Sequence, residues 1–354
     1  MRFIETVYAK LQRHPKRIVF PEGVEPRVLH AAAEFVKLKL GAPILLGNRD
    51  EIERLAKREK VDISRIGIID PATASDLPLF CQRMEKLQRY RNLGPADAMQ
   101  FLMNPNYFGA MMIQYGQADG LVGGVSGYAG SLLRPLFQLV KPLPGVSFIS
   151  GCMAVCVKDT RFGEGGALFF SDCAVVPEPT VEQLAKIGVQ AGKLCGQLTG
   201  ERPRVAYLSF STRGSAKHKA TERITAAAAL ARQEVEKEDI QIEVDGELQA
   251  DTALLPELAA RKAPDSLVAG RANVLVFPDL NSGNIAVKLV EHLAGAETYG
   301  QFLLGLSKPC ADLSRGATVE TIVGAAAIVG LQAIEYRKLY PANGTDDQTD
   351  ENQA

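Results

Sequence analysis

The chain of 354 residues lacks any large excess of charge and any long apolar run. Its 40 lysines and arginines nearly balance its 41 aspartates and glutamates, so no global basic field exists to attract nucleic acid. No segment approaches the roughly 20 uninterrupted apolar residues that cross a bilayer. The first 17 residues contain no apolar core long enough for a signal peptide. We therefore expect a cytoplasmic protein that binds neither nucleic acid nor membranes.

Cysteine and histidine are both scarce. The six cysteines are scattered in apolar surroundings, and none of them forms a CxxC pair. Cys152 and Cys156 lie four residues apart on a strand-like run, a spacing that suits neither a zinc site nor a disulfide framework. We expect reduced thiols and no bound metal. The four histidines are His14, His30, His218 and His292.

The composition is that of a globular protein, with 46% hydrophobic and 23% charged residues, and the length suggests about two domains. The sequence predicts a hairpin at the glycines of residues 163–166, a helix that Thr180 caps, a strand over residues 240–244 and a last helix from about Val319 to Tyr340. Apolar runs alternate with amphipathic helical patterns almost throughout. This alternation predicts a two-lobed α/β fold, with mostly parallel sheets and helices on both faces. We place the first lobe in residues 1–150 plus 296–340 and the second, inserted lobe in residues 151–295. The polar, acidic residues 341–354 are expected to form a disordered tail.

The most informative segment lies in the C-terminal quarter of the chain. An apolar strand, Val274 to Phe277, ends in a polar turn that includes Asn284, and the helix that follows carries Lys288. A second apolar run, Phe302 to Leu304, leads into a compact turn, Ala311 to Gly316, just before the last helix. Parallel α/β folds build ligand sites outside the carboxyl ends of strands. We therefore expect the two turns to converge on an anionic ligand.

The second of these turns reads ADLSRG and supplies Asp312, Ser314 and Arg315. An arginine held in a turn suits a phosphate or a developing oxyanion, because its guanidinium is planar and permanently charged. We favour a functional role for this turn over a purely structural one.

A glycine cluster spans Gly120 to Gly130, where five of eleven residues are glycine. Glycines let a backbone approach a ligand and present successive N–H groups as an anion-binding nest. Ser131 is expected to start a helix whose positive end faces the same ligand, with Arg134 one turn in. The spacing is neither the dinucleotide fingerprint nor a Walker loop. A tight turn before a helix is an equally weighted alternative.

The turn SFSTRGSAKH, residues 209–218, follows a buried strand. Ser211, Thr212 and Ser215 supply hydroxyl groups, and Arg213 adds charge, so the turn is a second candidate anion cradle. The alternative is ordinary helix capping by the same hydroxyl groups.

Two further strand ends carry reactive side chains. Cys173 could be a nucleophile, but no histidine lies near it in the sequence, so a small apolar residue beside a ligand is the favoured interpretation. Asp245, Glu247 and Asp251 could bind a metal or act as bases. Hydrogen bonding to neighbouring loops is the favoured alternative for these three carboxylates.

Eight segments, taken in order, resemble the phosphate acetyl/butyryl transferase family, and the resemblance covers nearly all of residues 15–338. The segments are RIVFPEG, NPNYFGAMMIQYGQADGLVGG, LLRP, FSDCAVVPEPT, RVAYLSFSTRGSAK, VDGELQADTA, KAPDSLVAGRANVLVFPDLNSGNIAVK and DLSRG. Each segment alone is a modest signal, but eight in the order of the family make a specific one.

The resemblance implies a two-lobed α/β protein with a cleft between the lobes and the architecture of isocitrate and isopropylmalate dehydrogenases. It also implies a homodimer with no tightly bound cofactor. The implied reaction is the reversible transfer of an acetyl group between CoA and inorganic phosphate, in which acetyl-CoA and phosphate give acetyl phosphate and CoA. Both substrates are bound together, and the CoA thiolate attacks the carbonyl carbon of the acyl phosphate directly.

The resemblance further implies roles for individual residues. Ser314 would lie beside the CoA thiol and assist removal of its proton. Arg315 and Arg134 would hold phosphate and stabilise charge on the carbonyl oxygen. Residues implied to line the cleft or the path of CoA and the acyl group are Lys288, Asn284, Cys173, Ser211, Thr212 and Ser215.

One departure from the family pattern concerns the base. Thr321 stands where the family carries an aspartate implicated as the base, and Glu320 lies beside it. None of the eight segments that resemble the family contains a histidine, so we expect a carboxylate to accept the proton. We expect Glu320 to serve as the base ahead of Asp312.

A second departure is Gln88, which stands at an expected arginine and for which Arg89 or Arg91 could substitute. The departures leave propionyl or butyryl transfer as an alternative to acetyl transfer. A non-catalytic acyl-CoA-sensing module is another alternative, against which the retained Ser314 and Arg315 argue. An oxidoreductase on the same architecture would need a nucleotide loop that the sequence does not show.

Overall fold

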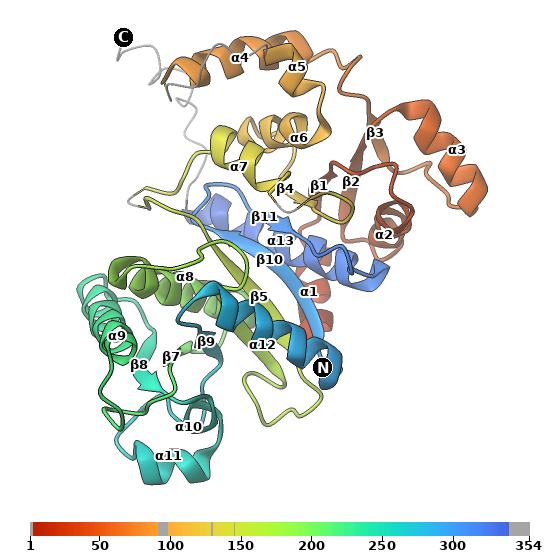
Figure 1. Ribbon diagram of the computed structural model, residues 1–354. Helices are drawn as coiled ribbons and strands as arrows, with labels where there is room; N and C mark the ends of the chain where they lie inside the picture. Colours follow the sequence, from red (N-terminus) through yellow and green to blue (C-terminus); the bar gives the residue numbers. More distant parts are fainter. Residues whose placement is uncertain (1–2, 91–97, 129, 145, 340–354) are drawn as a thin grey trace.

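The computed structural model describes residues 3–90, 98–128, 130–144 and 146–339, apart from the side chains of residues 88–90 and 335–339 (Figure 1). The strands are β1 (Lys16–Phe20), β2 (Gly41–Leu46), β3 (Gly67–Ile69), β4 (Gly120–Gly123), β5 (Ser150–Cys156), β6 (Ala167–Ser171), β7 (Arg204–Leu208), β8 (Glu243–Leu248), β9 (Val274–Val276), β10 (Glu297–Leu304) and β11 (Cys310–Asp312). The helices are α1 (Phe3–Gln12), α2 (Pro26–Lys37), α3 (Arg49–Glu59), α4 (Leu77–Tyr90), α5 (Ala98–Leu102), α6 (Pro105–Gln114), α7 (Leu133–Leu139), α8 (Val181–Thr199), α9 (Lys219–Lys237), α10 (Ala250–Leu254), α11 (Pro256–Lys262), α12 (Leu280–Leu293) and α13 (Val319–Leu339). The tail predicted for residues 341–354 lies outside the described residues.

The α/β prediction is confirmed, but the strands form one sheet rather than several. In the described residues, eleven strands follow the order β3-β2-β1-β4-β11-β10-β5-β6-β9-β7-β8. Pairing is parallel from β3 to β11 and again from β6 to β8. Between these halves, β10 and β5 pair in antiparallel fashion with each other and with their outer neighbours. The sheet is therefore mixed, although most of its pairs are parallel.

The antiparallel centre of the sheet separates the turn after β9 from the turn after β11, which were expected to lie together. β9 and β11 run in opposite directions, so their carboxyl ends lie at opposite edges of the sheet. The expectation that both turns converge directly is wrong for this reason. Helix α12 makes the connection instead, because its 14 residues rise about 21 Å and return the chain to the start of β10.

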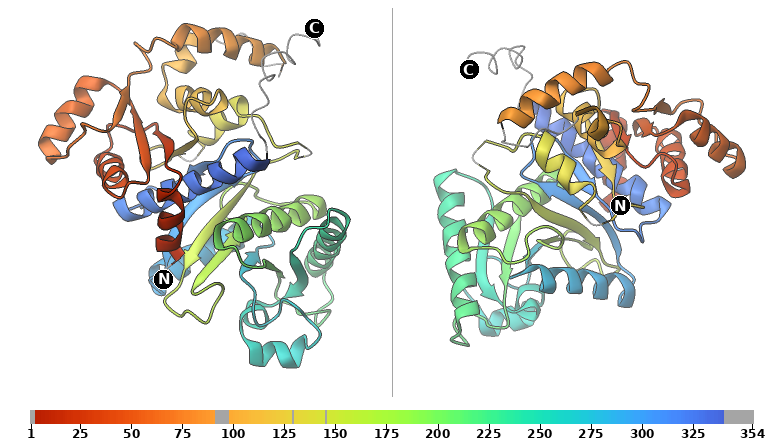
Figure 2. Two further views of the ribbon diagram at one scale, coloured as in Figure 1. Left: turned by 180° about the vertical axis from the view of Figure 1, so that it is seen from behind. Right: turned by 45° about the horizontal axis from the view of Figure 1, so that its top comes forward.

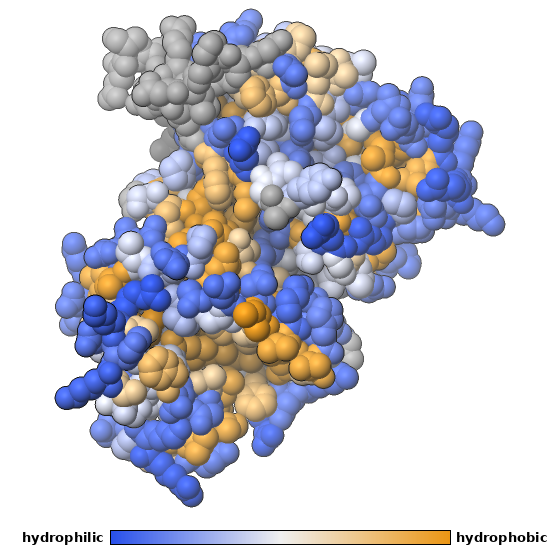
Figure 3. Space-filling model, in the orientation of Figure 1, coloured by the Kyte–Doolittle hydropathy of each residue, from blue (hydrophilic) through white to orange (hydrophobic). Residues whose placement is uncertain are grey.

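The buried side chains show where a cleft can form. On one face of the sheet, the largest apolar cluster is continuous beneath α1, α2, α13, α8 and α9. Figure 2 shows α13 lying across this face with α1 beside it. On the opposite face the core is divided, with one cluster beneath α4–α7 and another beneath α10–α12. Figure 3 shows a hollow between these two parts of the molecule.

The division of the core falls at β5 and β10, in the middle of the sheet. Gly151 of β5 faces it, and a Cβ atom there would lie 2.9 Å from Asp172 Oδ1 and 3.0 Å from Gln301 Oε1. Both of those side chains are buried and polar. A glycine and two buried polar side chains therefore lie between the two apolar clusters on this face.

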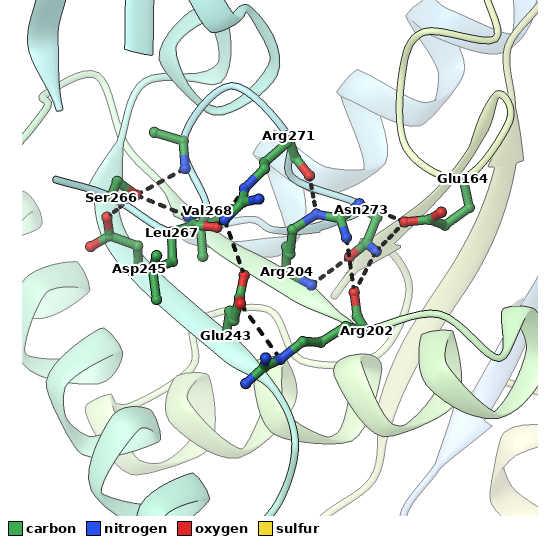
Figure 4. A network of polar contacts seen from close by, with 11 residues as sticks. Glu164, Arg202, Arg204, Glu243, Asp245, Ser266, Leu267, Val268, Arg271 and Asn273 are labelled. Atoms are coloured by element: carbon green, nitrogen blue, oxygen red, sulfur yellow. Dashed lines mark hydrogen bonds and ion pairs between the residues drawn. The ribbon is translucent and has the colours of Figure 1, made fainter. Parts of the chain in front are cut away.

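Local sequence signals account for much of the secondary structure. Thr180 caps α8 in a reciprocal capping box with Gln183, as its position before a 3.6-residue apolar period predicts. The hairpin predicted at the 163–166 glycines is present between β5 and β6. Glu164 in that hairpin accepts hydrogen bonds from Arg204 and Asn273, which attach it to β7 and the start of β9 (Figure 4).

Candidate functional site

The turn that follows β11 is the centre of the candidate site. Ser314, Arg315 and Gly316 are all exposed there. The N–H group of Leu313 donates to the carbonyl oxygen of Gly123 at 2.7 Å, which fixes the turn to the end of β4. Within the described residues, the Arg315 guanidinium has no hydrogen-bonding or ion-pair partner. The turn therefore presents a hydroxyl group and an uncommitted permanent cation to solvent.

Arg27 of α2 holds this turn in place, a role that the sequence analysis missed. Its Nη1 donates to the carbonyl oxygens of Arg315 at 2.7 Å and Ala317 at 2.9 Å, and its Nη2 donates to that of Val125 at 3.2 Å. Its Nε donates to Glu25 Oε1 at 2.7 Å. One side chain thus links α2, the glycine-rich loop and the turn after β11. The arginine that closely follows the RIVFPEG segment was the available signal.

We expect Arg27→Ala to destabilise the fold by about 1–3 kcal/mol, because partly buried carbonyl groups would lose a charged donor. Turnover should also fall, since the position of the Arg315 backbone depends on the same bonds. Urea denaturation and steady-state assays measure the two effects. The matched control is Arg49→Ala, because the Arg49 side chain is 58% exposed on α3, away from this turn. Equal effects of the two variants would contradict the role assigned to Arg27.

The glycine-rich loop does form an amide nest, but a carboxylate of the protein itself fills it. Glu22 accepts hydrogen bonds from the N–H groups of Val125 at 2.8 Å, Ser126 at 2.7 Å and Gly127 at 3.0 Å, and from Ser126 Oγ at 2.8 Å. These three N–H groups are therefore not free to bind a substrate anion in this structure. The expectation of an open nest at this loop is wrong because of Glu22.

Ser131 and Arg134 lie just beyond this loop. Ser131 does not start a helix, since α7 begins at Leu133, and its hydroxyl packs over Gly127 so closely that a Cβ there would lie 2.5 Å away. Arg134 is exposed on α7. Burial raises the pKa of Tyr107, and the charge of Arg134 opposes that effect, which places the guanidinium near the Tyr107 hydroxyl.

A cavity of about 440 Å³ joins the turn after β11 to α12. Its polar lining includes Ser314, Lys288 and Glu320, so the structure brings these three predicted residues together. Lys288 Nζ lies 2.7 Å from Glu291 Oε2, and Glu291 also accepts a hydrogen bond from Thr298. The remaining lining residues are Ile4, Tyr8, Met153, Glu291, Ala296, Glu297, Thr298, Tyr299, Gly300, Leu313, Gly316, Ala317, Thr318 and Thr321.

The two candidate bases differ in their surroundings. Glu320 is exposed in the first turn of α13, where hydrogen bonds from its own backbone N–H and from Thr318 lower its pKa. Asp312 is partly buried at the end of β11, where burial, with the charge of Glu22, raises its pKa to about 7. Thr321 exchanges hydrogen bonds with Thr318 as a helix cap. Glu320 lines the cavity and Asp312 does not, whereas only Asp312 has a pKa near neutrality, which favours it as a proton acceptor at neutral pH.

Cys173 and Asn284 lie together at the start of α12. Cys173 has no exposed surface, and a Cβ atom at Gly283 would lie 3.2 Å from its sulfur. Burial raises the pKa of the Cys173 thiol well above its usual range, which disfavours the thiolate. Asn284 Nδ2 donates to the Cys173 carbonyl oxygen at 3.1 Å. The expected contact between the Cys173 side chain and a ligand is wrong for this structure, because α12 covers the sulfur.

The hydroxyl turn after β7 is also filled by a carboxylate of the protein. Glu247 accepts hydrogen bonds from Ser211 Oγ at 2.9 Å and from the Gly214 N–H at 2.7 Å. Ser215 Oγ lies 3.1 Å from Ser211 Oγ, and Thr212 Oγ1 accepts from the Gln249 N–H. Burial alone would raise the pKa of Glu247, but these bonds and one from Thr225 lower it. The candidate anion cradle at residues 211–215 is therefore occupied, which corrects that expectation.

The neighbouring carboxylates take part in hydrogen bonds and ion pairs, as the favoured alternative predicts. Asp245 pairs with Arg213 at 2.6 Å and Arg232 at 3.3 Å, and it accepts from Ser266 (Figure 4). Asp251 pairs with Lys262 at 3.1 Å. Among the residues that the structure describes, no three His, Cys, Asp or Glu side chains are grouped to hold a metal ion.

Two predicted residues lie at the edge of the described chain or beyond it. Arg89 lies in the last turn of α4, but its side chain is not among those described, and Arg91 lies outside the described residues. No helix in the described part of the chain has the length and apolar character that a bilayer crossing requires.

The chain is similar to known proteins over almost its whole length. Residues 2–330 match the family model described as Phosphate acetyl/butaryl transferase. The chain is 42% identical to a phosphate acetyltransferase of Thermoanaerobacterium thermosaccharolyticum over 333 residues, covering 94% of this chain and 100% of that protein. It resembles the crystal structure of a phosphotransacetylase from Streptococcus pyogenes with a TM-score of 0.85 and 37% identity, covering 94% of this chain and 98% of that one.

A more distant likeness concerns the fold alone. A putative 4-hydroxythreonine-4-phosphate dehydrogenase from Salmonella typhimurium has a TM-score of 0.53 at 13% identity, and the match covers 90% of this chain and 99% of that one. The family match over most of the chain, together with relatives of nearly equal length, settles the assignment: the chain belongs to the phosphate acetyl/butyryl transferase family.

Proposed function

We propose that the protein is a phosphate acetyltransferase, which converts acetyl-CoA and phosphate reversibly into acetyl phosphate and CoA. The names of its relatives support this activity. The observation that carries the proposal is that Ser314 and Lys288, which come from opposite halves of the sheet, line one cavity beside the uncommitted cation of Arg315. CoA and its acetyl ester are substrates here, and the proposal requires no tightly bound cofactor.

Arg315 binds the phosphate group in this proposal. Its side chain is exposed, its chain neighbours Ser314 and Gly316 line the cavity, and its backbone is held by Arg27. A planar guanidinium can donate two parallel hydrogen bonds to phosphate oxygens. In the transition state it also stabilises charge that develops on the carbonyl oxygen. Arg134, which is exposed on α7 after the glycine loop, is the second proposed phosphate-binding cation.

The reaction proceeds by direct transfer in a ternary complex. Asp312 accepts the proton of the CoA thiol, whose ordinary pKa of about 8.5 leaves it mostly protonated at neutral pH. The sulfur then forms a bond to the carbonyl carbon of acetyl phosphate. The bond between that carbon and the phosphate oxygen breaks, and phosphate leaves with the electron pair. Ser314 orients the thiol, and Lys288, with Glu291 beside it, lines the cleft on the α12 side.

The acyl group and the domain division belong to the same proposal. We favour acetyl over propionyl or butyryl groups because the named relatives are acetyltransferases. We propose the same two lobes, residues 1–150 plus 296–340 and residues 151–295, in the manner of isocitrate and isopropylmalate dehydrogenases. The divided core on one face of the sheet supports this division. We also retain a cytoplasmic location.

An arsenolysis assay tests the function most simply. Acetyl-CoA is incubated with the protein and arsenate or phosphate, and free CoA is measured with a thiol reagent. We expect anion-dependent release of CoA, with acetyl-CoA preferred over propionyl- and butyryl-CoA. Absence of release with all three thioesters would favour a non-catalytic acyl-CoA sensor, which would still bind acetyl-CoA in a calorimeter. Preference for a longer thioester would select the phosphate propionyl- or butyryltransferase.

We further propose that the protein is a homodimer that pairs through α12. Ile285, Leu289 and Leu293 are 56%, 52% and 82% exposed, and their spacing places them along one side of the helix. Figure 3 shows an apolar band over α12. An exposed apolar stripe can be covered by the same stripe of a second copy around a two-fold axis. The dimer would then hold in place the helix that carries Lys288.

Leu289→Glu is expected to convert the dimer into monomers, because a charge would be buried in the paired stripe. Sedimentation velocity measures the change. Leu79→Glu is the control, since Leu79 is 42% exposed on α4 in the other half of the molecule, and it should leave the dimer intact. A wild-type protein that sediments as a monomer, or a Leu289→Glu variant that remains dimeric, would contradict this assignment.

A further inference from the structure

The Glu22 side chain sits where the sequence suggests a ligand anion. It follows β1 after Pro21, and its two carboxylate oxygens accept four hydrogen bonds from residues 125–127 at 2.7–3.0 Å. β1 and β4 are parallel neighbours, so their carboxyl ends meet at one edge of the sheet and bring Glu22 to this loop. The carboxylate therefore fixes the shape of the glycine loop without any bound substrate.

The same loop separates Glu22 from Asp312. β4 and β11 are parallel neighbours, with Gly123 opposite Asp312 in the register. Gly124 follows, and a Cβ atom there would lie 2.1 Å from Asp312 Oδ1. Its φ of +91° is also one that favours glycine. Glu22 thus reaches one part of a loop whose other part packs directly on the Asp312 carboxylate.

The other charged groups around Asp312 are engaged elsewhere or exposed. Arg27 of α2 is directed at the carbonyl oxygens of the loop and the turn and at the Glu25 carboxylate. Arg315 on the same turn and Glu320 on α13 are exposed. Residues 123–127 of the loop contribute no titratable side chain, and neither does Gln301 on the adjacent β10. Glu22 is the charged neighbour that acts on Asp312, and with burial it raises the Asp312 pKa to about 7.

We propose that Glu22 is a positioning residue for the reaction, whose carboxylate fixes the glycine loop against Asp312 and holds a negative charge on the other side of that loop from this proton acceptor. The inference rests on the proposed function, in which Asp312 receives the thiol proton. As the sulfur forms its bond to the acyl carbon, the proton moves from sulfur to an Asp312 oxygen. Phosphate leaves with the electrons of the broken C–O bond, and Asp312 then releases the proton to solvent. A base with a pKa near the working pH serves this transfer best.

The test is the pH dependence of kcat/KM in Glu22→Gln. Without the negative charge, the pKa of Asp312 falls, so the acid limb of the profile should move down by about one pH unit. Glu22→Asp keeps the charge on a shorter side chain, so its acid limb should stay near that of the wild type even if the rate falls. Ser126→Ala removes one of the four hydrogen bonds to Glu22 without changing charge, and its limb should also stay in place.

Thermal unfolding measured at several pH values gives a second test that does not depend on enzyme activity. The difference in unfolding temperature between Asp312→Asn and wild type should grow as the pH rises from about 4 and should level off near pH 7. In a Glu22→Gln background, the difference should level off at a lower pH. If Glu22→Gln changes neither the acid limb nor the pH at which the difference in unfolding temperature stops growing, Glu22 only holds the loop and the proposal is overturned. A wild type that shows the levelling near pH 7 but exchanges no acyl group would instead count against the proposed function.

Should Glu22→Gln not fold, Glu22→Ala takes its place, because it also removes the charge. An acid limb displaced to lower pH in Glu22→Ala would support the role of the charge, and an unmoved limb would overturn it. The limb must also disappear in Asp312→Asn, since the group that titrates is then absent. An acid limb that persists unchanged in Asp312→Asn would overturn the assignment of Asp312 as the acceptor and with it that of Glu22.

Discussion

Replacement of Arg315 by alanine is expected to lower turnover by at least about 100-fold, the effect of removing one donor that stabilises a developing oxyanion. Arg315 lies on an exposed turn whose residues Ser314 and Gly316 line the cavity, and its guanidinium has no partner among the described residues. Its loss therefore removes a charge that only a ligand can use. Because the fold does not depend on this side chain, the unfolding temperature should change little. Initial rates with saturating acetyl-CoA and phosphate measure the effect.

Two control variants distinguish a role of Arg315 in the reaction from a general effect of losing a positive charge. Arg315→Lys keeps one positive charge but loses the planar fork, so we expect it to recover only part of the activity. Arg161→Ala removes an arginine whose side chain is 83% exposed in the β5–β6 connection, and it should behave as wild type. An Arg315→Ala variant with unchanged turnover would remove this residue from the chemistry.

Asp312→Asn is the second change with a large expected effect. We expect turnover to fall by about 100-fold or more, which is the range of general base catalysis. An amide has the shape of the carboxyl group but cannot accept the thiol proton. The acid limb of the pH–rate profile near pH 7 should disappear with it. Glu320→Gln is the matched comparison, and because Glu320 is exposed and its pKa is lowered, we expect a change of no more than about threefold. A larger loss in Glu320→Gln than in Asp312→Asn would return the role of base to Glu320.

The same substitution should stabilise the protein at alkaline pH. The pKa of Asp312 is about 7 in the folded protein and near 3.9 in an unfolded chain. Its contribution to stability is therefore fully present below about pH 4 and is lost as the pH rises through 7. The loss is on the order of 2–4 kcal/mol. Asp312→Asn should unfold at a higher temperature than wild type at about pH 8, and the difference should shrink towards about pH 4. A constant difference across this range would contradict the raised pKa.

Elements with a clear apolar period could be predicted from the sequence. The helix expected from Thr180 onwards is α8, and the last helix, expected from Val319 to Tyr340, is α13 to Leu339. Helix α8 has a reciprocal cap and a one-sided apolar period that the sequence displays directly. Helix α13 is buried on all sides from Ile322 to Ala333, so a long, nearly continuous apolar run is the signal that predicts it. Element boundaries were predicted less well. The strand expected at residues 240–244 is β8, Glu243–Leu248, which begins three residues later.

The direction of strands could not be predicted, because an apolar run does not show whether its strand is parallel or antiparallel to its neighbours. β10 and β11 are separated by only five residues and pair in antiparallel fashion, a reversal that the run from Phe302 to the ADLSRG turn conceals. For this reason the turns after β9 and β11 were placed at one edge. The residues of α12 still meet the turn after β11, so Lys288 and Ser314 share a cavity for a reason that the sequence did not show.

The sequence also could not show what fills the two candidate anion-binding turns. The glycine loop and the hydroxyl turn both offer convergent donors, and each is filled by a glutamate of the chain, Glu22 and Glu247. Donor-rich turns look alike in sequence whether a ligand or a carboxylate of the protein completes them. Only the strand order, which sets Glu22 beside the end of β4 and Glu247 beside the end of β7, distinguishes the cases.

A crystal structure with CoA and phosphate bound together would show whether the cavity between α12 and the turn after β11 is the catalytic site. We expect a phosphate oxygen within about 3.2 Å of the Arg315 guanidinium. The CoA sulfur should face Ser314, and Lys288 should line the opposite wall. CoA and phosphate bound elsewhere, with Arg315 directed into solvent and the cavity between α12 and the turn after β11 empty, would contradict the account.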